Sequence, residues 1–291
     1  MLSIDPKEIA PAKLQGYLQS AVAPRPIAFA STLDNYGNPN LSPFSFFNVF
    51  SSNPPILIFS PARRVRDNTT KHTLINAVNT KEVVINVVNY EMVQQMSLSS
   101  TEYPDGVNEF EKAGFTMLAS DKVSPFRVAE SPVQFECKIN EVIALGDQGG
   151  AGNLVICEVV KIHINEAVLD ATGMIDQHKI DLVARMGANW YSRSNVGMFE
   201  VEKPLTTLGI GVDMIPDFIK ESGYFDGNDF GKLGNIENIP TEEEIAIFVK
   251  ENFEVKAVLS ADDMDTKFQK AKEYVDNGRA IDAWKLLLAK K

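Results

Sequence analysis

The chain has few of the residues that mark several common classes of protein. Only two cysteines and three histidines occur among its 291 residues. Cys137 and Cys157 lie inside predicted strands without metal-ligand spacing, which predicts buried thiols in a reducing compartment rather than a disulfide framework. Long apolar runs are also missing. One of the longest, Val83–Val88, falls far short of the roughly 20 residues that a membrane-spanning helix needs.

The chain also lacks an excess of positive charge. The sequence has 28 basic and 39 acidic side chains and a net charge of −11. A non-specific nucleic-acid binder needs a basic face, and an anionic membrane surface attracts basic clusters, so the composition predicts neither nucleic-acid nor membrane binding. The start, MLSIDPKEIAPAKL, has the pattern of neither a signal peptide nor a transit peptide. We therefore expect a cytoplasmic protein.

The most informative stretch runs from residue 25 to residue 61. It opens with a β-rich apolar run over 26–33 and turns at 34–39, where Asn, Gly and Pro supply the special backbone angles. A second run over 41–50 and a short buried strand over 56–59 complete the stretch. This pattern predicts several consecutive strands.

The second run mixes aromatic and short polar side chains instead of alternating polar with apolar residues. Its members, together with two serines that follow it, are Ser42, Phe44, Ser45, Phe46, Phe47, Asn48, Phe50, Ser51 and Ser52. Rings offer contact area, and hydroxyls and amides offer fixed hydrogen bonds. The mixture predicts a wall that faces a flat, polar-edged aromatic ligand.

Four cations crowd into the segment 60–80, although acids outnumber bases along the chain. They are Arg63, Arg64, Arg66 and Lys71. Apolar residues at helical spacing follow them, and Asn68 and Thr69 are candidate N-cap residues. A capped helix start with nearby cations is a natural anion site, but a solvated surface helix has the same pattern. Both interpretations stay open on this segment alone.

The middle of the chain predicts a strand over 81–89 that is buried on both sides, and then a long hairpin. The hairpin's glycine-rich connection, Gly146–Gly152, precedes no helix and lacks a P-loop lysine, so we interpret it as a flexible turn rather than a nucleotide loop. No dinucleotide-binding βαβ unit is predicted. His163 alternates with hydrophobic neighbours, which favours a strand residue over a metal ligand.

The amino-acid composition changes after residue 200. A long irregular connection, rich in Gly, Asn and Asp over 222–239, precedes three predicted helices. The first starts at the capping box Thr241-Glu242-Glu243-Glu244, and the others cover 261–275 and 278–290. We therefore expect one domain over 1–200 and a helical extension over 201–291. This extension either packs against the first domain or a dimer, or docks another protein.

Several motifs in succession resemble the flavin reductase-like family, whose members have an FMN-binding split β-barrel. The resemblance covers roughly residues 20 to 200. The matching residues are Arg25-Pro26-Ile27-Ala28, Ser31-Thr32-Leu33-Asp34, Asn40, Ser42-Pro43-Phe44-Ser45-Phe46-Phe47-Asn48, Pro54-Pro55, Asn108-Glu109-Phe110 through Gly114, Glu130-Ser131-Pro132, the hairpin around Gly146, and Arg185-Met186-Gly187.

The resemblance implies a mainly β fold with helices, an FMN-binding split β-barrel, here followed by the helical extension. It assigns side chains to three parts of FMN. They are Ser31, Thr32, Ser45, Phe46 and Asn48 for the ring and ribityl chain, Ser60, Arg63, Lys71 and Thr73 for the phosphate, and Arg185, Gly187 and Tyr191 near the ring, where they could instead cover the barrel. His72 stands where relatives carry Asp in a Lys-Asp-Thr triplet, and either approaches the phosphate or is exposed.

The resemblance also implies an activity and an assembly. Family members are typically homodimers with the flavin at the subunit interface, and we expect an NAD(P)H-dependent flavin reductase that supplies a partner oxygenase or other electron acceptor. Hydride transfer between stacked rings requires positioning and no metal or nucleophile. Two alternatives stay open: a flavoredoxin-like FMN electron carrier and a non-catalytic flavin-binding module.

Overall fold

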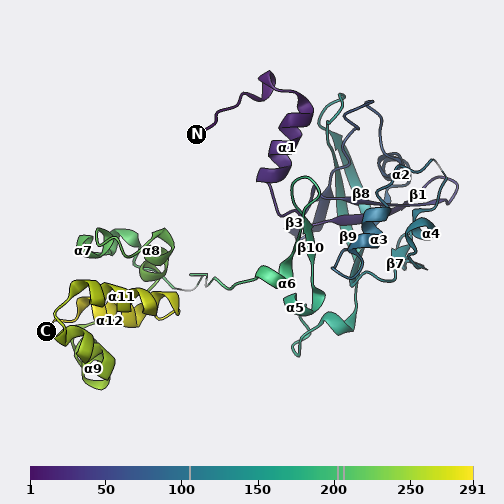
Figure 1. Cartoon of the computed structure of the whole chain (residues 1–291). Coiled ribbons are helices and arrows are strands. Elements are labelled where there is room, and N and C mark those ends of the chain that lie inside the picture. The colour runs from purple at the N-terminus through teal and green to yellow at the C-terminus, as the bar shows by residue number, and fades with distance from the viewer. Residues whose placement is uncertain (105, 202, 206, 291) are drawn as a thin grey trace. The chain divides into compact units, whose positions relative to one another are not determined.

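The computed structural model describes residues 1–104, 106–201, 203–205 and 207–290 (Figure 1). The chain divides into two compact units, Met1–Phe199 and Glu200–Lys291. Each unit has its own buried hydrophobic core. The first unit combines sheets and helices, whereas the described elements of the second are all helical.

The first unit is built on a seven-stranded antiparallel sheet. The strands predicted over 26–33 and 56–59 and the two strands of the long hairpin are present, which confirms those predictions. In spatial order the strands are β2 (Pro39–Phe44), β1 (Ala28–Leu33), β5 (Glu82–Val87), β8 (Val133–Ala144), β9 (Asn153–Ile164), β4 (Pro55–Phe59) and β3 (Phe47–Ser52).

The order of the strands forces the sheet to curl. β2 and β3 are the two edge strands, yet only Ser45 and Phe46 separate them along the chain. Three fully extended residue steps span about 10 Å, much less than the width of a flat seven-stranded sheet. The two edges must therefore approach each other at a seam formed by residues 44–47. The sequence had suggested one continuous wall over 41–50, and the structure divides that wall at the seam.

Helices α2 (His72–Thr80), α3 (Val93–Leu98) and α4 (Glu109–Ala113) lie beside β1 and β2 (Figure 1). Apart from α1, which has 11 residues, the other elements of the first unit are short. They are η1 (Pro6–Glu8), α1 (Pro11–Ala21), β6 (Met117–Leu118), β7 (Arg127–Val128), η2 (Glu166–Val168), α5 (Gln177–Ile180), β10 (Val183–Arg185), β11 (Tyr191–Arg193) and α6 (Ser194–Gly197).

The predicted N-cap residues of α2 are wrong. Lys71 is the N-cap, and it makes no side-chain cap hydrogen bond. Asn68 has a left-handed backbone with φ 58° and accepts a hydrogen bond from Arg63 Nε, while the Thr69 hydroxyl donates to Asp67. Both side chains close the preceding loop, because short polar groups bond as readily to a turn as to a helix start.

The second unit contains more helix than the sequence predicted. The predicted capping box of Thr241 and Glu244 is present. The run 222–239 was wrongly expected to be irregular throughout, because Asp226 and Asp229 form a second capping box that starts a helix despite three glycines. The helices are η3 (Val212–Met214), α7 (Asp217–Lys220), α8 (Gly227–Gly234), α9 (Glu242–Glu251), α10 (Phe253–Ser260), α11 (Met264–Asp276) and α12 (Ala280–Leu288).

None of the described helices is long and apolar enough to cross a membrane. The core of the second unit is instead organised around Trp284 on α12, which is fully buried. Its Nε1 donates a hydrogen bond to the carbonyl of Leu233 at 2.9 Å. The indole therefore joins α12 to α8 through both packing and a satisfied polar group.

Replacing Trp284 with alanine is expected to destabilise the helical unit by about 3–5 kcal/mol, because a large cavity forms and a buried carbonyl loses its donor. Far-UV circular dichroism during urea unfolding measures the loss. Phe253→Ala is the control, since that ring is 84% exposed on the same unit. Equal stabilities of the two variants would contradict the placement of Trp284 in the core.

Candidate functional site

A cavity of about 420 Å³ opens at the seam between β2 and β3. This volume lies within the range of small-molecule and cofactor sites. Phe44, Ser45, Phe46 and Ser60 line it from the seam, and Arg63–Arg66 with Lys71 line it from the segment before α2. The cavity thus brings an aromatic and hydroxyl-bearing wall together with a group of cations.

The seam side is held in place by the sheet and by one buried arginine. The Phe44 ring is nearly fully buried and packs 5.4 Å from the Phe59 ring, whereas Phe46 is 39% exposed. The Ser45 hydroxyl accepts from Arg25 Nε at 3.4 Å, and the Ser60 hydroxyl accepts from the amide of Asn153 at 3.1 Å. The Phe44 ring is thus packed into the core, whereas part of the Phe46 ring is exposed.

The cationic side is a loop that rests on the glycine-rich hairpin. The amide of Arg63 donates to the carbonyl of Ala151, and the amide of Gly150 donates to the carbonyl of Arg63. A Cβ on Gly149 would lie 3.0 Å from the carbonyl oxygen of Val65, so only glycine fits without displacement. The segment joins β8 to β9, which confirms the predicted connection between two strands, and it also supports the arginine loop.

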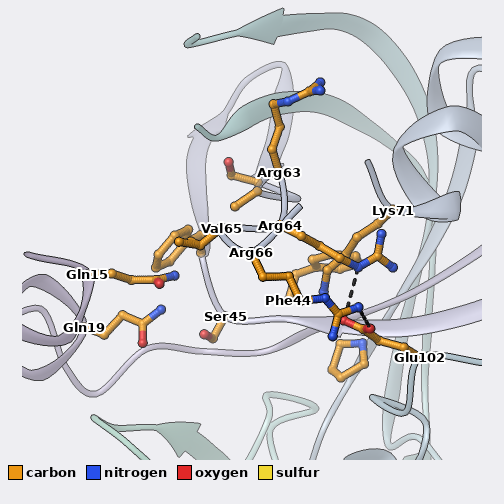
Figure 2. Close-up of a pocket in the computed structure, with 14 residues that line it drawn as sticks. Gln15, Gln19, Phe44, Ser45, Arg63, Arg64, Val65, Arg66, Lys71 and Glu102 are labelled. Atoms are coloured by element: carbon orange, nitrogen blue, oxygen red, sulfur yellow. Dashed lines mark hydrogen bonds and ion pairs between the residues drawn. The ribbon is translucent and has the colours of Figure 1, made fainter. Parts of the chain in front are cut away.

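Two arginines of this loop turn toward Glu102. Arg64 Nε lies 3.1 Å from Glu102 Oε1, and Arg66 Nη2 donates to Glu102 Oε2. Figure 2 shows these groups on one side of the cavity and Gln15 and Gln19 of α1 on the other. Arg64 is further fixed because its Nη1 donates to the Thr69 hydroxyl at 2.9 Å.

Lys71 is half-buried beside the aromatic wall. Its Nζ lies 5.0 Å from the centroid of the Phe44 ring. Burial lowers the pKa of the ammonium group, and the nearby Arg64 lowers it further. Within the described part of the chain, this ammonium group makes no salt bridge or hydrogen bond. A partly desolvated cation beside an aromatic wall favours an added anionic group.

Five of the predicted site residues line this one cavity: Ser45, Phe46, Ser60, Arg63 and Lys71. Arg63, the first choice among the arginines, points away from Lys71 and Glu102 (Figure 2). Its guanidinium donates to the Asn68 side chain at 2.6 Å and to the Asn68 carbonyl at 2.7 Å. Arg64 and Arg66 turn toward Glu102 instead.

Other predicted residues lie outside the cavity lining. The hydroxyls of Thr32 and Thr73 are buried in a network with Asn40 and Asn76, in which Thr73 Oγ1 donates to Asn40 Oδ1 at 2.7 Å. Ser31 Oγ is buried without a hydrogen-bond partner among the described residues. Their assignment to the ring and phosphate stays a prediction.

Asn48 and His72 also lie outside the lining. Asn48 is exposed on β3, where its side chain accepts from the amide of Val49. His72 is half-buried as the first residue of α2. Any contact of these two residues with a ligand likewise stays a prediction.

The predicted residues from the segment 176–199 gather at a second cavity. Gly187 and Tyr191 line this space of about 540 Å³ together with Trp190 and Ser20. The guanidinium of Arg185 lies 4.6 Å over the Tyr191 ring. The structure thus brings these three residues together, but not into the cavity that holds Lys71.

Arg25, which the sequence analysis assigned no role, connects the two cavities. Its buried guanidinium donates from Nη2 to the carbonyl of Met186 at 2.9 Å, in addition to its contact with Ser45. Nη1 donates to the carbonyls of Gln19 and Val22 at the end of α1. Burial and the neighbouring Arg185 lower the pKa of this guanidinium. The hydrogen bonds therefore offset part of the free-energy cost of burying a charged group.

A separate cluster joins His163 to two carboxylates. As predicted, His163 is a strand residue, on β9. Its Nε2 lies 2.6 Å from Glu136 Oε1, and an oxygen of Asp121 lies within 4.8 Å of both ligand atoms. Glu136 also accepts from the amides of Asp121 and Lys122, and Asp121 pairs with Lys161 at 2.7 Å. These contacts favour an internal ion-pair network over a metal site.

Comparison with known proteins gives the same fold and family. The family model described as "Flavin reductase like domain" matches residues 20–181. The chain belongs to this family. An uncharacterized protein of Halalkalibacterium halodurans is 33% identical over 205 residues, which cover 70% of this chain and 97% of that protein. An uncharacterized protein of Aquifex aeolicus is 37% identical, over 60% of this chain and 86% of its own length.

Two solved structures extend the comparison. Nitrilotriacetate monooxygenase component B from Bacillus cereus has a TM-score of 0.65 and 28% identity, over 69% of this chain and 98% of its own. The 2-nitrobenzoate 2-nitroreductase NbaA of Pseudomonas fluorescens has a TM-score of 0.64 and 22% identity, over 72% of this chain and 100% of its own. At this identity the likeness shows the shared fold alone. The predicted split β-barrel with a helical extension is confirmed.

Asp67 in the arginine loop is expected to titrate at unusually low pH. The Thr69 hydroxyl, the Thr69 amide and Arg66 hold its pKa at about 2, below the ordinary 3.8. Its stabilising effect is therefore complete above pH 3.8 and is lost as the pH falls through about 2. Carboxyl-carbon NMR shifts measure the midpoint. Thr69→Val should raise the titration midpoint of Asp67, whereas Thr70→Val should leave it unchanged. A midpoint near 3.8 in the unmodified protein would contradict the assigned contacts.

Proposed function

We propose that this chain binds FMN in the seam cavity and works as an NAD(P)H-dependent flavin reductase. One observation carries the proposal. A single cavity joins the Phe44 and Phe46 rings to Arg64, Arg66 and Lys71. Flavin mononucleotide has a flat aromatic ring at one end and a phosphate at the other, so it requires both kinds of surface at a fixed separation.

The residues present fit that group. Phe46, Ser45 and Ser60 would hold the ring and ribityl chain, since they combine exposed aromatic area with hydroxyls at the seam. Lys71 and Arg64 would hold the phosphate, because a partly desolvated ammonium and a planar guanidinium form strong charge-assisted hydrogen bonds to anionic oxygens. Membership of the flavin reductase-like family supports the same cofactor.

FMN, when bound, supplies the two-electron chemistry. The chain's own task is positioning: it orients the flavin ring at the seam, neutralises the phosphate charge and leaves space for a nicotinamide. Arg25 is a positioning residue in this scheme, because it fixes Ser45 relative to the turn at Met186. None of these tasks requires a side chain to transfer a proton.

The proposal includes a homodimer with the flavin at the subunit interface. Exposed apolar side chains on the edge strand β3, Val49 and Phe50, fit a second copy of the chain. The likeness to a monooxygenase component B supports an oxygenase as the acceptor of reduced flavin. Two buried free thiols, Cys137 and Cys157, are compatible with the cytoplasm as the location.

The visible spectrum of the purified protein and rapid mixing with NADH or NADPH test the activity. Bound FMN is expected to give flavin absorbance that bleaches quickly on mixing with either nicotinamide. Absorbance that only a reduced protein donor bleaches would favour an electron carrier. A bound flavin that neither reductant bleaches would favour a non-catalytic binding module, and a protein that binds no added FMN would overturn the proposal.

Lys71→Ala is expected to weaken FMN binding about tenfold or more, because one charge-assisted contact to the phosphate is lost. Riboflavin lacks the phosphate, so its affinity should hardly change. Quenching of flavin fluorescence measures both dissociation constants. Lys122→Ala, which removes an exposed lysine outside the cavity, is the matched control. An unchanged FMN affinity in Lys71→Ala would remove Lys71 from the site.

A further inference from the structure

Glu102 is the one acidic side chain that lines the cationic cavity among the described residues. Its two oxygens are shared between Arg64 Nε at 3.1 Å and Arg66 Nη2. The hydrogen bond from Arg66 lowers the pKa of Glu102, and the contact with Arg64 adds to the effect, so the carboxylate is ionised at neutral pH. The cavity therefore already contains an anion, supplied by the chain itself.

This anion comes from an irregular part of the chain. Glu102 follows α3 after the turn at Ser99–Thr101, where the Thr101 hydroxyl donates to the carbonyl of Leu98 at 2.8 Å. The Glu102 side chain is 47% exposed even with both arginines in contact. Water therefore screens the two ion pairs, and their loss opposes the transfer of this carboxylate from the arginines to water only weakly.

The two arginines also have contacts that do not involve Glu102. Arg64 Nη1 donates to the Thr69 hydroxyl and to the carbonyl of Thr70, and Arg66 Nε lies 3.1 Å from Asp67 Oδ2. Their remaining N–H groups, now occupied by Glu102, match the spacing of two oxygens on a carboxylate or on a phosphate. Both anions thus compete for the same donors.

We propose that Glu102 is an internal counter-ion that a phosphate monoester displaces from Arg64 and Arg66. The inference rests on the proposed FMN site and names a residue that sets its specificity. Because a ligand must displace a carboxylate, a dianionic phosphate binds productively, and a flavin without phosphate leaves Glu102 in place. The carboxylate also keeps three clustered cations from repelling one another before the ligand arrives.

The test compares Glu102→Gln with Glu91→Gln, an exposed control that changes the net charge equally. Glu102→Gln removes two weak, partly exposed ion pairs that compete with the phosphate of FMN for Arg64 and Arg66. FMN should therefore bind about threefold to tenfold more tightly to this variant. Riboflavin affinity should equal that of the unmodified protein. Flavin fluorescence titration at fixed ionic strength measures all affinities, and the control should match the unmodified protein for both ligands.

Inorganic phosphate gives a second measurement that does not depend on flavin. It should raise the unfolding temperature of the first unit in Glu102→Gln at lower concentration than in the unmodified chain or in Glu91→Gln. FMN binding that is unchanged or weakened in Glu102→Gln would overturn the role of Glu102 while leaving the flavin site intact. If inorganic phosphate stabilises the first unit but FMN does not bind, the proposed function would be overturned, whereas the displacement of Glu102 by phosphate would still hold.

Discussion

The closeness of the two sheet edges is the constraint on which the rest of the first unit depends. β2 and β3 belong to opposite ends of a seven-stranded sheet, and the two residues between them cannot bridge a flat one. Curling the sheet solves this problem and creates a concave seam. Ser45 and Phe46 sit at the seam because they are the connection itself, so the element that fixes the fold also forms one wall of the cavity.

Electrostatics determine the opposite wall. In a chain with a net charge of −11, the loop before α2 concentrates positive charge next to a buried aromatic ring. The glycine hairpin makes this possible, since Gly149 lets the two loops approach closely. Glu102 compensates part of the charge. The candidate site thus brings together four segments of the chain, at 15–19, 43–46, 60–71 and residue 102.

Local patterns predicted the regular elements well. Strand periodicity, the capping box at Thr241 and the buried strand over 81–89 all correspond to elements of the structure, because these signals lie within a few neighbouring residues. The helix α8 escaped prediction since its glycines suggested a loop, although its capping box at Asp226 was visible in the sequence. Composition was misleading there, and the specific cap was the better guide.

The site was predictable only in part, for a physical reason. The family resemblance had assigned Ser45 and Lys71 to FMN, and both line the cavity. The choice among the arginines depended on side-chain direction: Arg63 turns to Asn68, and this cannot be read from spacing. Glu102 and Arg25 contact residues that are far away in the chain. Arg25 lies in a motif of the family resemblance, but no local pattern shows which residues it contacts.

The two tryptophans have a practical consequence. Trp190 is 75% exposed in the first unit, and Trp284 is fully enclosed in the second. Indole emission shifts to shorter wavelength in an apolar setting, and iodide quenches only rings that it can reach. One fluorescence spectrum therefore contains two separable signals, one from each unit. A red shift and the appearance of iodide quenching in the protected signal therefore report unfolding of the helical unit in the intact chain, without any added label.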